Sequence, residues 1–260
     1  MSFSNVRAAE LKVAVAKYTI DAPADFDAFA HKQARWLDEA KALGARIAVL
    51  PEYLSLELAA TFDAAVSSDL HASLAATQRH HGAFVDLFSR LSRERDMHVV
   101  AGTFLLDNGR GRYRNRSYSF GPDGTHVWQD KLRLTGFEKN TGVIESGDEL
   151  KVFETDGVRS AISVCYDSEF PLPVRAQCEA GARLLIVPSC TDTEAGATRV
   201  RVGCLARALE NRCFVAQSVT AGVAPWSPAL DVNTGEAALI APMDVGLPHD
   251  GMVVQTRGDQ

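Results

Sequence analysis

Three polar side chains with complementary chemistry stand at or just beyond the ends of strand-like segments. They are Glu52 after residues 46–51, Lys131 after residues 126–130 and Cys165 after residues 161–164. A thiol is mostly protonated at neutral pH, so it needs a neighbouring base or cation before it can act as a nucleophile. Glu52 could take the thiol proton, while Lys131 could stabilise the thiolate and the oxyanion that forms when a carbonyl is attacked. If the strands lie side by side, their carboxyl ends bring the three groups to one rim, which is where open α/β sheets bind ligands.

Each of the three residues also has an interpretation without catalysis. Free cysteine is among the most buried residue types, so Cys165 could be an inert apolar side chain. Glu52 could be a solvated loop carboxylate after a proline, and Lys131 could protect an edge strand against aggregation. The residue types and their spacing leave both interpretations open.

Alternating apolar and amphipathic segments predict sheet strands with helices packed outside them. Strands are expected at residues 13–16, 46–50, 98–104, 112–120, 126–131, 150–153, 158–165, 183–188, 213–219, 236–241 and 251–255. Helices are expected at residues 25–43, 73–95, 174–180 and 198–211. Because no linker or repeat interrupts the pattern, it predicts one α/β domain over residues 1–260, with a mixed sheet or two packed sheets.

Charge and hydropathy argue against several classes of function. The formal net charge of −6 gives no electrostatic footprint for nucleic acid or for an anionic membrane. The basic stretch at residues 110–116 is short, so it is interpreted as a solvated hairpin loop. No apolar run approaches the roughly 18 residues of a membrane-spanning helix, and the start of the chain lacks a hydrophobic signal region.

The cysteines and histidines argue against a metal site or a disulfide framework. The five cysteines are odd in number and none forms a Cys-x-x-Cys pair, which disfavours a zinc ribbon and a secreted disulfide scaffold. The histidines show no paired spacing on one element, since His80 and His81 are adjacent and point in different directions on the expected helix. We therefore expect no metal site, and a location in the reducing cytoplasm.

The segments around the three polar residues resemble the signature blocks of the nitrilase superfamily, the carbon–nitrogen hydrolases. The blocks are LPEY at residues 50–53, DKLRL at residues 130–134 and VCYDSEFP at residues 164–171, in the family's order. Residues 135–138 (TGFE) match the block that carries a second glutamate, Glu138, and residues 187–190 and 199–211 match two segments after the nucleophile. The resemblance covers nearly the whole chain and favours Cys165 as a nucleophile.

The resemblance implies a four-layer α-β-β-α sandwich that commonly pairs into dimers, and a mechanism without a cofactor. Glu52 would take the Cys165 proton, the thiolate would attack an amide or nitrile carbon, and water would later hydrolyse the thioester. Lys131 and the backbone N–H of Tyr166 would hold the oxyanion. Glu138 would orient Lys131 or the attacking water, or have a purely structural role. A small-molecule amide and a second copy of the chain, in a homodimer or higher homo-oligomer, are then the expected partners.

The residues after Cys165 resemble the amidase branches of the superfamily. True nitrilases tend to carry Trp-Glu where Tyr166 and Asp167 stand. Glu169 takes the place of an arginine found in the branch that hydrolyses ω-amides of dicarboxylic acids. We therefore expect no capture of a substrate carboxylate there. Glu169 could instead favour a cationic or polar amide, or be a structural hydrogen-bond acceptor.

Further pocket-lining candidates are Tyr53, Thr191 and Trp226, each near an expected strand end or loop at the same rim. Each could equally belong to the core or to a loop. The favoured function is hydrolysis of non-peptide linear amides, which releases ammonia or an amine and a carboxylic acid. Nitrile hydrolysis or acyl transfer by the same Glu-Lys-Cys site, and a non-catalytic binding or regulatory role, are the alternatives.

Overall fold

Two β-sheets form the centre of the molecule. The computed structural model describes residues 11–258. The predicted absence of a signal region concerns residues 1–10, which lie outside the described residues. The first sheet has the strand order β1 (Val13–Val15), β3 (Ile47–Leu50), β4 (His98–Asp107), β5 (Tyr113–Phe120) and β6 (His126–Asp130), with β7 (Ile144–Glu145) paired to β5. The second has the order β14 (Met252–Gln255), β13 (Ala238–Ile240), β11 (Phe214–Val223), β10 (Leu184–Ser189), β9 (Val158–Ile162) and β8 (Phe153–Thr155), with β2 (Lys17–Thr19) and β12 (Val232–Asn233) paired to β11.

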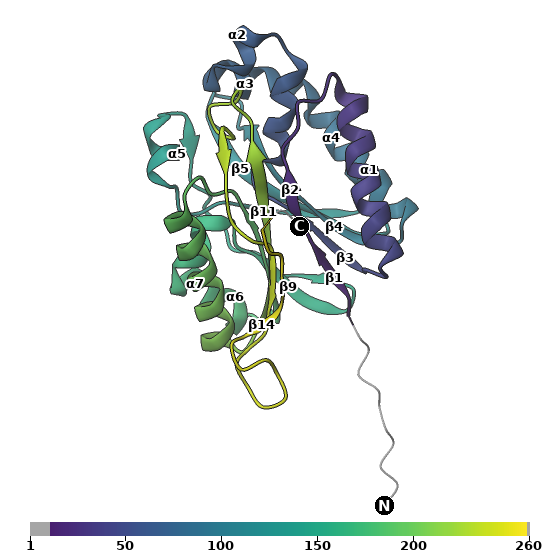
Figure 1. Ribbon diagram of the computed structural model, residues 1–260, viewed down its shortest axis with the longest axis vertical. Helices are drawn as coiled ribbons and strands as arrows, with labels where there is room; N and C mark the ends of the chain where they lie inside the picture. The colour runs from purple at the N-terminus through teal and green to yellow at the C-terminus, as the bar shows by residue number, and fades with distance from the viewer. Residues whose placement is uncertain (1–10, 259–260) are drawn as a thin grey trace, which may run out of the picture.

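Helices cover the outer face of each sheet (Figure 1). The first sheet is covered by α1 (Phe26–Ala42), α3 (Leu70–Thr77) and α4 (His81–Glu94), and the second by α6 (Pro171–Glu179) and α7 (Glu194–Asn211). The shorter helices are η1 (Leu54–Thr61), α2 (Ala64–Ser67), η2 (Gln78–His80), α5 (Gly136–Asn140) and η3 (Cys165–Glu169), where η denotes a 3₁₀ helix. The predicted four-layer α-β-β-α sandwich is confirmed.

Two apolar cores hold the layers together. One lies between the first sheet and its helices, where three phenylalanines of the helices pack with two of the sheet: Phe29, Phe84, Phe88, Phe104 and Phe120. The other joins the inner faces of the two sheets and the inner sides of α6 and α7. Each fully buried phenylalanine contributes about 1.5–3 kcal/mol. The strand ends that carry the predicted site residues are therefore fixed by packing on both sides.

The chain passes from the first sheet to the second at Ala16, between β1 and β2. The Ala16 N–H donates to the Val49 carbonyl of β3 (3.1 Å), and the Ala16 carbonyl accepts from the Val219 N–H of β11 (2.8 Å). The Ser218 hydroxyl of β11 donates to the carbonyl of Leu50, the last residue of β3 (2.9 Å). These bonds fix the carboxyl end of β3 against the second sheet.

The helix predicted at residues 73–95 is broken into α3, η2 and α4. The break lies at Gln78, whose side chain binds the backbone of β4. Its Nε2 donates to the Leu105 carbonyl (2.8 Å), and its Oε1 accepts from the Asp107 N–H (3.0 Å). Periodicity did not reveal the break, because it depends on a strand that comes later in the chain.

The strand predicted at residues 150–153 begins only at Phe153. The preceding residues bind the side chain of Gln129 on β6 instead of a strand backbone. Gln129 Oε1 accepts from the Lys151 N–H (2.9 Å), and Gln129 Nε2 donates to the Glu149 carbonyl (2.6 Å).

The basic stretch at residues 110–116 is only in part the solvated hairpin loop that was predicted. Strand β5 begins at Tyr113, so Arg114 and Arg116 lie on the sheet. Both pair with the buried Asp130, at 3.4 Å and 2.7 Å respectively.

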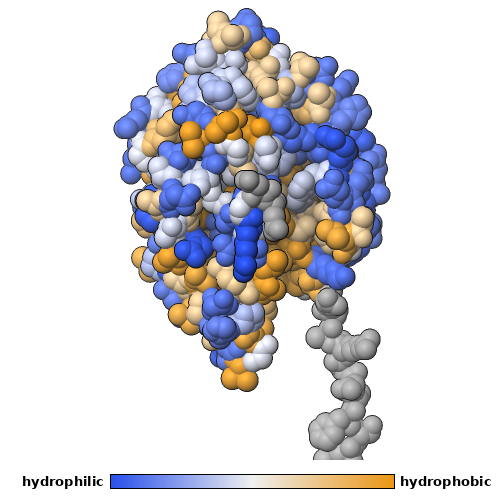
Figure 2. All heavy atoms as spheres, in the orientation of Figure 1, coloured by the Kyte–Doolittle hydropathy of each residue, from blue (hydrophilic) through white to orange (hydrophobic). Residues whose placement is uncertain are grey.

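The surface mixes hydrophilic and hydrophobic residues, and the lower tip of the view in Figure 2 is hydrophobic. That tip is the loop between β13 and β14, which exposes Met243 and Val245. Leu172 on α6 and Val202 and Leu209 on α7 are exposed as well. Over residues 11–258, none of the helices has the length and apolar character needed to cross a bilayer.

Candidate active site

Glu52 lies in the turn that follows β3. In this turn Tyr53 adopts a left-handed conformation (φ 61°), and its N–H donates to the Thr103 hydroxyl of β4 (2.8 Å). Gly102 packs against the turn, and a Cβ there would lie 2.0 Å from the carbonyl oxygen of Pro51, far inside van der Waals contact. Glycine therefore lets β4 approach the turn and hold the buried Glu52 carboxylate at the end of the sheet.

Lys131 is buried between two carboxylates. Its Nζ lies 2.8 Å from Glu52 Oε1 and 2.8 Å from Glu138 Oε2, and the three side chains are at most 1% exposed. Burial opposes the charged form, but Glu138 and Glu52 raise the pKa of Lys131 well above its usual value, so the ammonium stays charged. Three of the predicted site residues thus lie in one buried ion cluster.

Asn115, on β5, bridges the two carboxylates of this cluster. Its Nδ2 donates to Glu52 Oε1 (2.8 Å) and to Glu138 Oε1 (3.1 Å), and the side chain is fully buried. Its backbone carbonyl accepts from the Lys131 N–H (2.9 Å), so Asn115 also places the lysine. The sequence pattern did not identify this residue. The signal that it carried was an amide in the middle of a strand, where asparagine is depleted.

Glu138 is held in place by the start of α5 and by Tyr53. The Thr135 N–H and hydroxyl donate to Glu138 Oε2 (2.9 and 3.1 Å), and the Glu138 N–H donates back to the Thr135 hydroxyl, which makes a capping box. The Tyr53 hydroxyl donates to Glu138 Oε1 (2.9 Å). Burial opposes ionisation, but Lys131 and these donors outweigh it and lower the pKa of Glu138. Both of its oxygens are engaged, and it stays a carboxylate.

Cys165 begins the 3₁₀ helix η3, so the prediction that a strand runs to this residue is wrong. Strand β9 ends at Ile162, and Cys165 has a φ of 47°, which no strand accommodates. The Ser168 hydroxyl donates to the Cys165 carbonyl (2.7 Å) and stabilises the turn. A residue other than glycine in this backbone region is strained, and such residues cluster at active sites.

The three predicted strand ends come from two sheets and not from neighbouring strands of one sheet. Strands β3 and β6 run in the same direction in the first sheet but are separated by β4 and β5, and β9 belongs to the second sheet. Their carboxyl ends meet because the two sheets pack face to face. The predicted juxtaposition of Glu52, Lys131 and Cys165 therefore holds, although its assumed geometry was wrong.

The Cys165 thiol is buried, and its environment favours the protonated form. Its Sγ donates to the Cys190 carbonyl (3.5 Å), and the Cys190 N–H donates to Glu52 Oε2 (3.1 Å). Burial and the Glu52 carboxylate raise the pKa of Cys165 well above its usual value, and the Lys131 ammonium only partly offsets them. Burial also raises the pKa of Glu52, again against Lys131. A carboxylate with raised proton affinity thus stands beside a thiol, which suits general-base activation.

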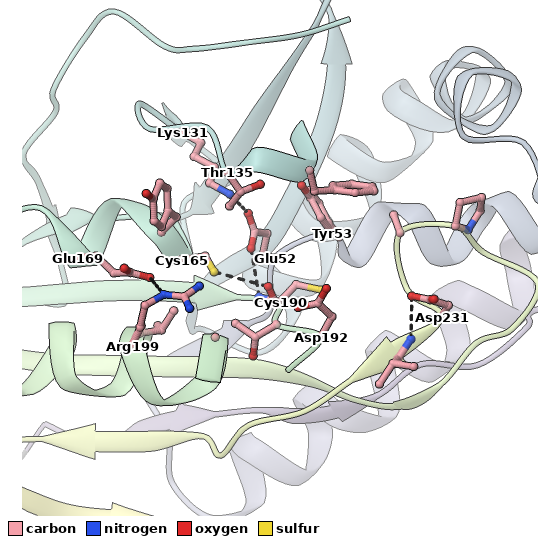
Figure 3. A pocket seen from close by; sticks show the side chains of 18 residues that line it. Glu52, Tyr53, Lys131, Thr135, Cys165, Glu169, Cys190, Asp192, Arg199 and Asp231 are labelled. Carbon is pink, nitrogen blue, oxygen red and sulfur yellow. Dashed lines mark hydrogen bonds and ion pairs between the residues drawn. The ribbon is translucent and has the colours of Figure 1, made fainter. Parts of the chain in front are cut away.

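A cavity of about 240 Å³ opens onto this group of residues (Figure 3). Its lining includes Glu52, Lys131 and Cys165 together with the four predicted substrate-binding residues Tyr53, Tyr166, Glu169 and Thr191. Trp226, for which a position in the core was left open, does not line the cavity and packs against the core of the first sheet. Among residues 11–258, no group of three or more His, Cys, Asp or Glu side chains is arranged to hold a metal ion.

Two of the predicted substrate-binding residues have polar partners. The Thr191 hydroxyl donates to the Thr234 carbonyl (2.7 Å), which ties one wall of the cavity to the loop after β12. Glu169 Oε1 lies 3.4 Å from Arg199 Nε on α7, as Figure 3 shows. Arg199 also lines the cavity and was not identified as a separate candidate from the sequence.

Asp167 joins the loop after Lys131 to the turn that carries Cys165. Its buried carboxylate accepts from the Leu132 N–H (3.1 Å) and from the Arg133 N–H (2.6 Å). Burial raises the pKa of Asp167 to about 7, against these donors and the Lys131 ammonium, which favour the ionised form. These hydrogen bonds tie together the two loops that carry the ammonium and the thiol.

We expect the stability that Asp167 contributes to be lost as the pH rises from about 4 to about 7. Unfolded aspartate ionises near pH ~4, so the folded chain binds more protons than the unfolded chain until the pH passes about 7. The free energy of unfolding relative to Asp167→Asn should therefore fall through this window and level off above it. Urea unfolding of both proteins at several pH values measures it, and a difference independent of pH would contradict the assignment.

Comparison with known sequences places the chain in a family. A model of the carbon-nitrogen hydrolase family matches residues 12–245. The probable hydrolase YhcX of Bacillus subtilis is 29% identical over 248 residues, which are 95% of this chain and 47% of that protein, so the chain spans about half the length of this relative. The omega-amidase NIT2-B of Xenopus laevis is 25% identical over 220 residues, which are 82% of this chain and 75% of that protein.

Solved structures share the fold at low sequence identity. Nit3 of Saccharomyces cerevisiae, a nitrilase superfamily member, has a TM-score of 0.74 at 20% identity, over 95% of this chain and 85% of that one. A double mutant of the amidase from Nesterenkonia sp. AN1, in complex with acrylamide, has a TM-score of 0.74 at 18% identity, over 96% of this chain and 87% of that one. The family match, the four-layer fold and the predicted signature blocks agree. The chain belongs to the carbon-nitrogen hydrolase family.

Proposed function

We propose that this protein is a thiol-dependent amidase that hydrolyses the C–N bond of non-peptide linear amides. The observation that carries the proposal is the position of Cys165 beside the buried cluster of Glu52, Lys131 and Glu138, at a cavity large enough for a small amide. The products would be a carboxylic acid and ammonia or an amine. The amidase relatives support the reaction class, while the acyl group and the amine are left to experiment.

In the first half of the reaction, Glu52 takes the Cys165 proton as the sulfur attacks the amide carbonyl carbon. The C–S bond forms, and the carbonyl electron pair moves to oxygen. Lys131 and the Tyr166 N–H stabilise that oxyanion, because a charge in a buried site is costly without such donors. Glu52 then gives its proton to the nitrogen, the C–N bond breaks, and a thioester on Cys165 is left.

In the second half, water attacks the thioester as Glu52 takes a proton from it. The second tetrahedral species collapses, the C–S bond breaks, and Glu52 returns a proton to the leaving sulfur. We assign Glu138 to the orientation of Lys131 and not to acid–base chemistry. Its oxygens are occupied by Lys131, Tyr53, Asn115 and Thr135, and its pKa is lowered.

The other functions considered have less support. Tyr166 and Asp167 after the nucleophile favour amides over nitriles. Acyl transfer would use the same thioester with an amine in place of water. A non-catalytic role would leave unexplained a strained backbone at Cys165 and a carboxylate of raised pKa next to it.

We expect an acid quench during turnover of a linear amide to trap an acyl group on Cys165. Intact-mass measurement across a panel of amides should show a mass increase equal to the acyl group, and peptide mapping should place it on Cys165. A metal chelator should leave the rate unchanged, since every proposed step uses only groups of the protein and water. Acylation of Cys178, Cys190, Cys204 or Cys213 in its place, or turnover without any acyl adduct on Cys165, would contradict the mechanism.

The homodimer and the cytoplasmic location stay predictions. Helices α6 and α7 expose the apolar side chains of Leu172, Val202 and Leu209, which are candidate contacts for a second copy.

A further inference from the structure

The charges that line the cavity are unevenly paired. Within residues 11–258, the basic residues that line the cavity are Lys131 and Arg199. Lys131 is committed to Glu52 and Glu138, both at 2.8 Å. Arg199 has Glu169 as its partner, and the Glu169 side chain is only 18% exposed whereas that of Arg199 is 60% exposed. The enclosed carboxylate thus pairs with the exposed guanidinium, so each of the two cations already has an acidic partner.

Two further carboxylates line the cavity without such a partner. Asp192 follows β10, Asp231 precedes β12, and Figure 3 shows them on different parts of the wall. In the described part of the chain, neither has a basic side chain at ion-pairing distance. The lining therefore has four acidic residues, Glu52, Glu169, Asp192 and Asp231, against two basic ones, which leaves an excess of two negative charges.

Aromatic rings line the same space. Phe137 is 43% exposed, and Tyr166 is half-buried with its ring edge-on to Phe170 (4.9 Å between centroids). The face of an aromatic ring attracts a cation, and together with carboxylates it is the usual environment that recognises an ammonium group. These rings offer no comparable attraction to an anion.

Given the amidase function proposed above, we propose that the cavity selects its substrate by charge and takes amides that also carry a positively charged group. The Glu169–Arg199 pair removes the guanidinium as a binding site for carboxylates, while Asp192 and Asp231 attract the cation. The sequence pattern suggested Glu169 as a direct contact of a cationic substrate. Its pairing with Arg199 assigns it a different role, as the residue that neutralises the arginine.

Charged thiol reagents test the proposal without requiring turnover. Cys165 is treated with a trimethylammonioethyl and with a sulfonatoethyl methanethiosulfonate, and peptide mapping separates its modification from that of Cys190. The rate of the cationic reagent is divided by the rate of the anionic reagent. Dividing this ratio by the same ratio for a small free thiol gives the corrected ratio. We expect a corrected ratio well above one that falls as salt is added, because the charges at the mouth are exposed. A corrected ratio of one or below would overturn the proposal.

Substitutions show which residues cause the preference for the cationic reagent. Asp192→Asn and Asp231→Asn should each lower the corrected ratio by about two- to fivefold, the range for exposed charge pairs. Glu169→Gln should lower it as well, because it frees Arg199, and the double variant Glu169→Gln/Arg199→Gln should restore it. If the double variant behaves like Glu169→Gln alone, Arg199 is not the group that Glu169 controls.

Matched substrates connect this charge selection to catalysis. The three substrates are 5-aminopentanamide, pentanamide and the monoamide of glutaric acid, which share chain length and differ in charge. We expect kcat/KM to decrease in that order. If none of the three substrates is hydrolysed, the result counts against the amidase function. The corrected ratios of the thiol reagents would still decide the charge selection. Equal kcat/KM values for all three would overturn the charge selection alone.

Discussion

Replacing Cys165 with alanine is expected to abolish amide hydrolysis, with a loss of at least about 10⁴-fold in kcat, while the fold remains intact. Nucleophile deletions in hydrolases that act through a covalent intermediate cost about this much or more. Without the sulfur no thioester can form, and the remaining donors stabilise only a slow direct attack by water. Ammonia release from an amide that the wild type turns over measures the effect. Cys165→Ser should be nearly as inactive, because Glu52 has to deprotonate a hydroxyl of much higher pKa.

Cys190→Ala is the matched control for this experiment. Cys190 lines the same cavity, but its contacts with the reacting groups are made by its backbone, which alanine preserves. This variant should keep most of the activity. Unfolding curves of both variants should resemble that of the wild type. Retained activity in Cys165→Ala, or loss of activity only in Cys190→Ala, would refute the assignment of the nucleophile.

The site residues that a local sequence pattern predicted are those that follow strand-like segments. Glu52, Lys131 and Cys165 each stand after a short strand-like segment, and this placement was enough to suggest that they meet. Their common rim was predicted, but its origin in two facing sheets was not. The left-handed turn at Cys165 was also missed, because it depends on the packing of η3 and the Ser168 hydroxyl and not on the preceding run.

The residues that the pattern missed act on partners far away in the chain. Asn115 contacts Glu52 across 63 positions of sequence, and Asp167 contacts Leu132 across 35. Neither has a local sequence signal that specifies its partner, because strand order and sheet packing bring the pairs together. The same holds for Arg199, which lies 30 positions from Glu169. The fold and the juxtaposition of Glu52, Lys131 and Cys165 were therefore accessible from sequence, while the residues that contact them and the charges that line the cavity required coordinates.

Lys131→Met is expected to abolish activity and also to destabilise the protein by about 3–5 kcal/mol, the cost of leaving a buried charge without its partner. In this variant Glu52 and Glu138 face each other in a buried site without a cation, so both carboxyl groups gain affinity for protons. Their pKa values would then exceed those of the unfolded chain, and the stability would fall as the pH rises. The deficit relative to wild type should thus be larger at pH 8 than at pH 5. Urea unfolding at both pH values measures it.

The double variant Lys131→Met/Glu138→Gln separates the structural role of Lys131 from its chemical role. It removes one of the two stranded carboxylates, so it should recover part of the lost stability. It should recover no activity, because the oxyanion still lacks the ammonium. Lys41→Met, at the exposed end of α1, is the control for loss of a lysine charge and should lower the free energy of unfolding by at most about 1 kcal/mol, the range for a cation at a helix C-terminus. If Lys131→Met is as stable as the wild type, the cluster does not hold the charges inferred here. If the double variant hydrolyses amides, Lys131 serves only to balance the charge of Glu138.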